Sequence, residues 1–180
     1  MKKILSEQIK IPEGIECKAS GNKIEFKKGD KNSFVEIKLR GGEILVQDGN
    51  LILGHKRANK KELKIIKSDI AHIKNVFKGL NDDFVYKLEI CNVHFPMNVK
   101  VEGDKVLISN FLGEKITRVS KISPGVKVEV KNKEIIVSGS DIGKTGQTAA
   151  NLEKASKVRV RDRRIFQDGI FITEKPRRSM

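Results

Sequence analysis

The sequence predicts an α+β protein with two tandem duplicated domains, each a small antiparallel β-sheet packed against one α-helix. Three observations predict this fold class. Two β-rich patterns occur in the same order in both halves of the 180-residue chain, turn residues separate their strands, and a helical pattern follows the strands in each half. Short antiparallel pairs followed by a helix favour this class over a parallel, doubly wound fold.

The repeated patterns are predicted to be β-hairpins. The matching segments of the two halves are 21–29 with 103–113, and 44–53 with 128–137. Residues 48–50 in the first half, and Asn132 with Lys133 in the second, provide turn chemistry between β-rich runs. The order and spacing of the pairs agree, which indicates an internal duplication.

The first predicted helix follows Asn59, which is placed as an N-cap, with Glu62 completing a capping box. Apolar residues then recur three and four positions apart, and Gly79 is the predicted stop. The apolar stripe, which would cover one face of the sheet, consists of Leu63, Ile66, Ile70, Ile73 and Phe77.

The second predicted helix starts after Ser140 and ends near Ser156. Its residues Gly146, Ala149 and Ala150 are small, so they would let the helix backbone lie close to the sheet. A strand-like segment, 84–90, follows the first helix and marks the start of the second domain. The predicted divisions are an N-terminal domain (1–82), a C-terminal domain (83–174) and a basic tail (175–180).

The charge of the chain predicts a polyanionic partner. Lys and Arg number 37 and Asp and Glu 23, which leaves a net charge of +14 and a sequence pI near 9.8. No apolar run approaches the ~20 residues that a membrane span needs, and the N-terminal segment becomes polar after two apolar residues, so we expect an unexported protein without a membrane partner. Aromatic residues are only 5% of the chain, so stacking on unpaired bases is not expected to dominate.

Neither a metal nor another cofactor is expected. Cys91 and His94 have the spacing of half a zinc site, but no second pair of ligands follows, and Cys17 lies far away. We therefore interpret Cys91 as a buried strand residue and His94 as a surface residue. The chain also lacks the nucleophile elbow G-x-S-x-G, and its three histidines are scattered, so no catalytic group is predicted.

One segment supports an alternative, a nucleotide-binding phosphate-loop enzyme. Ser138–Thr145 differs from GxxxxGK[ST] only at Ser138. Such a loop works in a parallel sheet with a second strand that supplies an acidic residue, whereas the pattern here is antiparallel. The simpler interpretation is that Ser140 or Asp141 caps a helix and leaves Lys144 exposed, and a third is that the helix N-terminus and Lys144 meet an RNA phosphate.

Most arginines of the chain lie near its C-terminal end, where the planar guanidinium fork suits phosphate. The alternation of Val158 and Val160 with Arg159 and Arg161 predicts a half-buried strand with its arginines outward. Arg163 and Arg164 are adjacent and cannot share a strand face, so at least one is expected to pair with Asp162 or Asp168. Phe166 is interpreted as a packing residue and 167–169 as a turn with Gly169 at positive φ.

Residues 158–172, together with 137–141 and 146–151, closely resemble ribosomal protein six of the large subunit in its archaeal and eukaryotic form. The resemblance covers nearly the whole chain and includes the duplication. It implies a structural constituent of the large ribosomal subunit, cytoplasmic and not an enzyme, that binds large-subunit rRNA near the stalk base and the sarcin–ricin loop. Neighbouring ribosomal proteins and translational GTPases would be nearby partners, and the protein would support assembly and factor docking.

The candidate rRNA-binding residues are basic side chains of three regions. They are Arg159, Arg161, Arg163, Arg164, Lys154, Lys157 and Lys144 around the second helix and the arginine motif, Lys175, Arg177 and Arg178 in the tail, and Lys56, Arg57 and Lys60 before the first helix. Residues 142–144 depart from the charged pattern of the resembled family. A regulator that binds RNA outside the ribosome is a further alternative.

Overall fold

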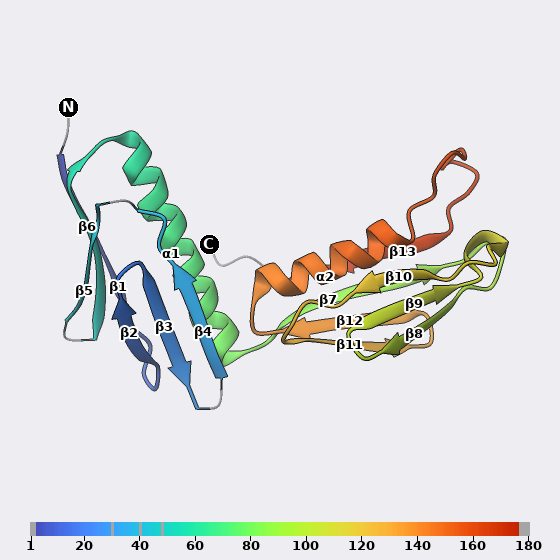
Figure 1. Cartoon of the computed structure of the whole chain (residues 1–180), viewed down its shortest axis with the longest axis horizontal. Coiled ribbons are helices and arrows are strands. Elements are labelled where there is room, and N and C mark those ends of the chain that lie inside the picture. The colour runs from blue at the N-terminus through green and yellow to red at the C-terminus, as the bar shows by residue number, and fades with distance from the viewer. Residues whose placement is uncertain (1–2, 30, 40, 48, 177–180) are drawn as a thin grey trace. The chain divides into compact units, whose positions relative to one another are not determined.

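The computed structural model describes residues 3–29, 31–39, 41–47 and 49–176, and divides the chain into two compact units. Unit 1 comprises residues 1–82 and unit 2 residues 83–180. Each is an α+β unit in which antiparallel strands accompany a helix, as predicted (Figure 1). Each unit contains two antiparallel sheets in its described residues, where the sequence predicted one.

Unit 1 is built from two three-stranded sheets and helix α1 (Lys60–Asn81). The first sheet has the order β1-β6-β5, with β1 at Lys3–Lys10, β5 at Glu43–Gln47 and β6 at Asn50–Ala58. The second has the order β2-β3-β4, with β2 at Glu16–Ser20, β3 at Lys23–Lys28 and β4 at Lys31–Glu36. The predicted hairpin of the segment 44–53 is the β5–β6 pair.

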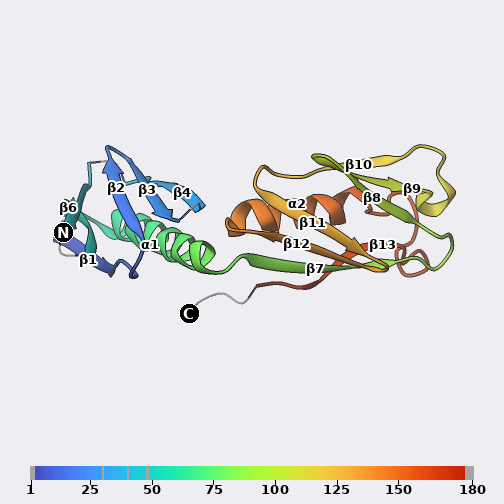
Figure 2. The ribbon, with the colours of Figure 1, turned by 90° about the horizontal axis from the view of Figure 1, so that it is seen from below.

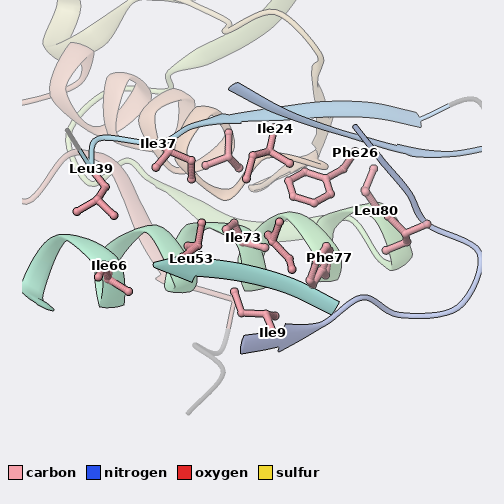
Figure 3. Packing of buried hydrophobic residues seen from close by; sticks show 13 residues of the cluster. Ile9, Ile24, Phe26, Ile37, Leu39, Leu53, Ile66, Ile73, Phe77 and Leu80 are labelled. Carbon is pink, nitrogen blue, oxygen red and sulfur yellow. The ribbon is translucent and has the colours of Figure 1, made fainter. Parts of the chain in front are cut away.

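Helix α1 begins as the sequence predicted. The Asn59 side chain accepts a hydrogen bond from the backbone N–H of Lys61 at 2.7 Å, and Glu62 Oε2 accepts one from the Asn59 N–H at 2.9 Å. The helix passes through Gly79, the predicted stop, because the buried Leu80 still packs in the core. Helix α1 contacts both sheets, so its apolar stripe meets side chains from each (Figure 3).

Unit 2 contains a four-stranded and a three-stranded sheet with helix α2 (Ile142–Ala155). The first sheet has the order β11-β12-β7-β13, formed by β7 (Phe84–Cys91), β11 (Val126–Lys131), β12 (Glu134–Gly139) and β13 (Gly169–Glu174). The second has the order β10-β9-β8, formed by β8 (Asn98–Glu102), β9 (Lys105–Ser109) and β10 (Arg118–Lys121), with the 3₁₀ turn η1 (Phe111–Gly113) before β10.

The two units have the same topology up to their helices. The order β1-β6-β5 of unit 1 corresponds to β7-β12-β11 of unit 2, and β2-β3-β4 corresponds to β8-β9-β10. Each helix follows the strand at the centre of its triplet. Strand β13 is an addition in unit 2, where it pairs with the outer side of β7.

Helix α2 packs against strands of both sheets of its unit (Figure 2). The approach is closest at Gly146, where an added Cβ would lie 2.8 Å from Tyr86 Oη on β7. Ala149 is fully buried, as expected for a residue that lets the helix lie close to the sheet. Ala150 is exposed and does not lie in the contact between α2 and the sheet.

Candidate nucleic-acid interface

The arginine motif forms a loop, residues 157–168, that projects from the end of unit 2 between α2 and β13 (Figure 1). We call this segment the arginine loop. The predicted strand across Arg159 and Arg161 is wrong. Val158 is buried, but Val160 is fully exposed and has a φ of 59°, a conformation that a β-branched residue rarely adopts and that no strand contains.

Asp168 anchors the C-terminal end of this loop. Its carboxylate accepts hydrogen bonds from the backbone N–H groups of Val93 at 2.8 Å and His94 at 3.0 Å, and its Oδ2 lies 2.6 Å from His94 Nδ1. Burial by itself would raise the pKa of Asp168, but these bonds outweigh it and hold the pKa below its ordinary value. Among the described residues, Asp168 therefore pairs with His94 and not with an arginine. His94 is exposed, as predicted, and its ring is held by Asp168.

Arg118 of β10 secures the other end of the loop. Its guanidinium donates to the carbonyl oxygens of Ala155 at 2.9 Å and Lys157 at 3.2 Å, and it lies 4.1 Å from the centroid of the Phe111 ring. Glu114 holds it through bonds of 2.6 and 2.8 Å, and the pKa of Glu114 is lowered mainly by the hydrogen bond from Arg118. This arginine donates hydrogen bonds to carbonyl oxygens that have no partner within α2, so its role is to stabilise the fold.

Phe166 is a packing residue, as predicted. Its ring stacks on the His94 ring with centroids 4.8 Å apart, and the Arg161 guanidinium lies 4.8 Å from its centroid. Arg161 is therefore held against the loop by a cation–π contact. The turn of this region lies at 163–165 rather than at the predicted 167–169, and Gly169 begins β13 with a φ of 157°.

Arg164 pairs with Asp162, one of the two acids predicted to hold an arginine. Its Nη2 lies 2.7 Å from Asp162 Oδ2, and its Nε donates to both carboxylate oxygens at 3.1 Å. The side-chain hydrogen bond from Arg164 lowers the pKa of Asp162. A phosphate would have to compete with this carboxylate for the guanidinium.

Four basic residues of the region are exposed and have no side-chain partner in the part of the chain that the structure describes. We call them the basic cluster, which consists of Lys154, Lys157, Arg159 and Arg163. Lys154 belongs to the last turn of α2, where a positive charge is also favourable to the helix dipole. The other three lie on the arginine loop, whose two ends are fixed by Arg118 and Asp168.

The candidates of unit 1 divide in the same way. Lys56 is paired with Glu43 at 2.7 Å, whereas Arg57 and Lys60 are exposed with no side-chain partner among the described residues. Lys56 and Arg57 belong to β6, not to a loop before the helix as the sequence suggested. Lys60 is the first residue of α1, where the N-terminal dipole disfavours a lysine and an RNA phosphate would offset that cost.

Ser138–Thr145 is not arranged as a phosphate loop. The segment leaves β12 in an antiparallel sheet, and Asp141 caps α2 by accepting from Gly143 N at 2.8 Å and Lys144 N at 3.3 Å. The Thr145 hydroxyl is buried and donates to the Asp141 carbonyl at 2.7 Å. Amides that would bind a phosphate are thus occupied, which contradicts the nucleotide-binding alternative. Asp141 is the predicted cap, and Lys144 is exposed.

The remaining candidates lie after β13. Lys175 is exposed, and Arg177 and Arg178 lie outside the described residues. Both cysteines are free, and no group of His, Cys, Asp and Glu within the described ranges could hold a metal ion. Neither helix in the described part is long and apolar enough to cross a membrane.

Comparison with known proteins found one matching family model and close archaeal relatives. The model described as "Ribosomal protein L6" matches residues 95–169. Three relatives carry the name "Large ribosomal subunit protein uL6". The protein of Aeropyrum pernix is 43% identical over 172 residues (94% of this chain, 93% of its own), that of Methanococcus vannielii 41% over 172 (96% and 94%), and that of Sulfurisphaera tokodaii 45% over 174 (95% and 92%).

Proposed function

The chain belongs to the uL6 family of large-subunit ribosomal proteins, and from this premise we propose that it binds large-subunit rRNA chiefly through the basic cluster at the end of unit 2. As a member of this family it is a structural ribosomal protein and not an enzyme, and it acts in the cytoplasmic ribosome. Binding of rRNA is general for the family. The residues that make the contact in this chain are our proposal.

The proposal rests on a contrast among the cations in and around the arginine loop, because protein groups hold some of them and not others. Arg118, Arg161 and Arg164 are held by protein groups, whereas all four members of the basic cluster are exposed and have no side-chain partner among the described residues. Unpaired like charges beside one another repel and are favourable only when a polyanion neutralises them. Because the loop is anchored at both ends, its backbone loses little conformational freedom on binding.

Phosphate contacts would supply most of the affinity. Arg159 and Arg163 can each offer two parallel N–H donors to phosphate oxygens, and Lys154 and Lys157 act as point charges. Such contacts read the shape of a folded RNA rather than its base sequence. Arg57, Lys60, Lys144 and Lys175, which are also exposed, are proposed as weaker additional contacts.

We further propose that unit 2 lies near the stalk base and the sarcin–ricin loop, beside neighbouring ribosomal proteins and the docking region of translational GTPases. There the protein would support subunit assembly and factor docking. Cross-linking of the assembled protein to rRNA, followed by mapping of the linked nucleotides, tests this position. Links confined to RNA remote from the sarcin–ricin loop would contradict it.

Salt dependence tests the basic cluster. We expect the double variant Arg159→Ala/Arg163→Ala to bind large-subunit rRNA more weakly and to lower the slope of log affinity against log salt by about 1 for each lost contact. The measurement is a filter-binding titration at several salt concentrations. Thermal unfolding should be unchanged because neither side chain has a protein partner in the described structure.

The charge-matched control is Lys100→Ala/Lys127→Ala, which removes two exposed lysines from β8 and β11. It should change the slope much less than the loop variant does. Equal slopes for the two double variants would show that binding follows net charge and not the basic cluster. Failure of the unmodified chain to sediment with large subunits would contradict the function itself.

A further inference from the structure

A cavity of about 510 Å³ opens beside the basic cluster, between the C-terminal end of α2, the arginine loop and β13. We propose that this cavity binds one unstacked nucleotide of the rRNA, with the base inside and the phosphate on the cations at the rim. The inference rests on the proposed function and deepens it, because phosphate contacts on an open surface require no cavity. Its volume lies within the range of about 300–1,000 Å³ that is typical of sites for small organic ligands.

The walls of the cavity suit a flat aromatic ring. Val158 and Ile170 are buried and give it an apolar base, and Phe166 and Phe171 border it. Phe171 is 43% exposed, and its ring lies beside Gly169, where an added Cβ would be 3.1 Å from Phe171 Cζ. The Phe166 ring already contacts His94 and Arg161, so a base would stack on Phe171, and such stacking tolerates any of the four bases.

Two polar side chains in the lining can contact the edge of a base. The Gln167 amide nitrogen donates to the Arg164 carbonyl at 3.2 Å, which leaves the Gln167 amide oxygen as an acceptor. Glu153 adds an exposed carboxylate. Both would accept hydrogen bonds from the amino or imino groups of a base, whereas Glu153 would repel a phosphate inside the cavity.

The cations are placed for the phosphate of the same nucleotide. Lys154, Lys157 and Arg163 all line the cavity, and none has a side-chain partner in the described structure. The cations at the rim suit a negatively charged group, and the lining suits a neutral, flat group that forms hydrogen bonds. A nucleotide has both, in its phosphate and its base. A base taken from a loop or bulge is already partly unstacked, so its extraction costs little.

A side chain that fills the cavity tests the inference. We expect Ala150→Trp to place an indole at the cavity wall, because Ala150 is exposed and lines the cavity. The matched control is Gln147→Trp, one turn earlier on α2 and outside the lining. The probe is a large-subunit rRNA transcript, with dimethyl sulfate and a carbodiimide to report base edges and hydroxyl radicals to report the backbone.

The unmodified chain and Gln147→Trp should protect at least one base that becomes reactive again with Ala150→Trp. The affinity of Ala150→Trp should fall about tenfold while its backbone protection persists. Phe171→Ala, which removes one wall, should expose the same base, with Phe34→Ala in unit 1 as its control. Far-ultraviolet circular dichroism verifies that each variant is folded.

The outcomes separate this inference from the proposed function. If backbone protection is present and the base footprints of all variants are identical, the cavity does not hold a nucleotide and the inference fails alone. The same holds if Ala150→Trp impairs subunit assembly without changing any base footprint, which would indicate a protein segment in the cavity. If the unmodified chain protects no backbone at all, the proposed function fails as well.

Discussion

The carboxylate of Asp168 joins the end of the arginine loop to Val93 and His94, which lie 75 and 74 residues earlier in the sequence. The Asp168 side chain is only 3% exposed, so its carboxylate relies on these three protein groups for hydrogen bonds. Arg118 plays the complementary part at the other end of the loop. At the residue scale, two groups of charged side chains can be told apart. Those that anchor the loop have protein partners, whereas those of the basic cluster have none among the described residues, and residue type alone does not distinguish the two groups.

We expect Asp168→Asn to destabilise unit 2 by about 1–3 kcal/mol, because a neutral amide replaces the charge-assisted hydrogen bonds of the carboxylate with weaker neutral ones. Urea unfolding followed by tyrosine fluorescence measures this directly, since Tyr86 is the single tyrosine and the chain has no Trp. The control Asp162→Asn lies in the same loop and is exposed, and its carboxylate pairs with Arg164 alone among the described residues. A loss of stability as large in the control would contradict the anchoring role of Asp168.

The lowered pKa of Asp168 also predicts a dependence on pH. The unfolded chain takes up the Asp168 proton at higher pH than the folded chain, so this contribution to stability is complete above the unfolded pKa and is lost as the pH falls through the folded pKa. Between about pH 5 and about pH 3, the free energy of unfolding should therefore fall more steeply with decreasing pH for the unmodified chain than for Asp168→Asn. Parallel curves would show that Asp168 does not titrate as inferred.

At the scale of elements, the close contact between α2 and β7 depends on a missing side chain. Gly146→Ala would improve the intrinsic helix propensity by about 1 kcal/mol. It would also place a Cβ 2.8 Å from Tyr86 Oη and 3.2 Å from its Cζ, so the helix or the ring must move. We expect a net loss of about 1 kcal/mol in the free energy of unfolding, measured by circular dichroism.

A second substitution should relieve the contact. Tyr86→Phe removes the nearest atom, so Gly146→Ala should cost less in the Tyr86→Phe background than in the unmodified chain. Additive effects of the two substitutions would contradict a direct clash. Gly143→Ala, on the first turn of α2, is the control for helix propensity, although its Cβ would lie 3.2 Å from Asp141 Oδ1.

The elements that local pattern determines were predicted well. Asn59 and Glu62 form the capping box that their spacing indicates, and the hairpin turn at Asn132 has the positive φ, 52°, that its residue type favours. These structures depend on neighbours a few residues away. The split of each unit into two sheets was missed because it depends on which hairpins pair, which alternation alone does not specify.

The candidate site was predicted in composition but not in shape. The alternation around Arg159 resembles a strand, yet Val158 is buried while Val160 points outward at positive φ. The interactions that shape the loop come from Arg118, which contacts carbonyls 37 and 39 residues away, and from His94. These partners are distant in the sequence, so no local spacing indicates them. The sequence therefore could not separate the arginines that contact protein groups from those that have no partner among the described residues.

At the scale of the whole molecule, the chain contains two separate hydrophobic cores. One is formed only by residues of unit 1 and the other only by residues of unit 2. We expect Ile73→Ala, which truncates a fully buried side chain of the first core, to destabilise unit 1 by about 2–5 kcal/mol. The tyrosine fluorescence transition, which reports unit 2 alone, should not move.

Circular dichroism, which reports both units, should show that unit 1 of Ile73→Ala unfolds at a lower urea concentration than unit 1 of the unmodified chain. The reciprocal variant is Ile135→Ala in the second core, which should shift the tyrosine transition and leave the other one in place. A coincident shift of both probes in either variant would indicate that the two units unfold as one cooperative body.

Strand β13 is the strand of unit 2 that has no counterpart among the described strands of unit 1, and it follows the arginine loop. During synthesis on a ribosome, β7 is made long before β13, so the two can pair only after the loop between α2 and β13 has emerged. The loop acquires its second fixed end at that moment, through Asp168 directly before the strand. On the proposed function, a newly made chain therefore presents the complete arginine loop to ribosomal RNA only after β13 has paired with β7.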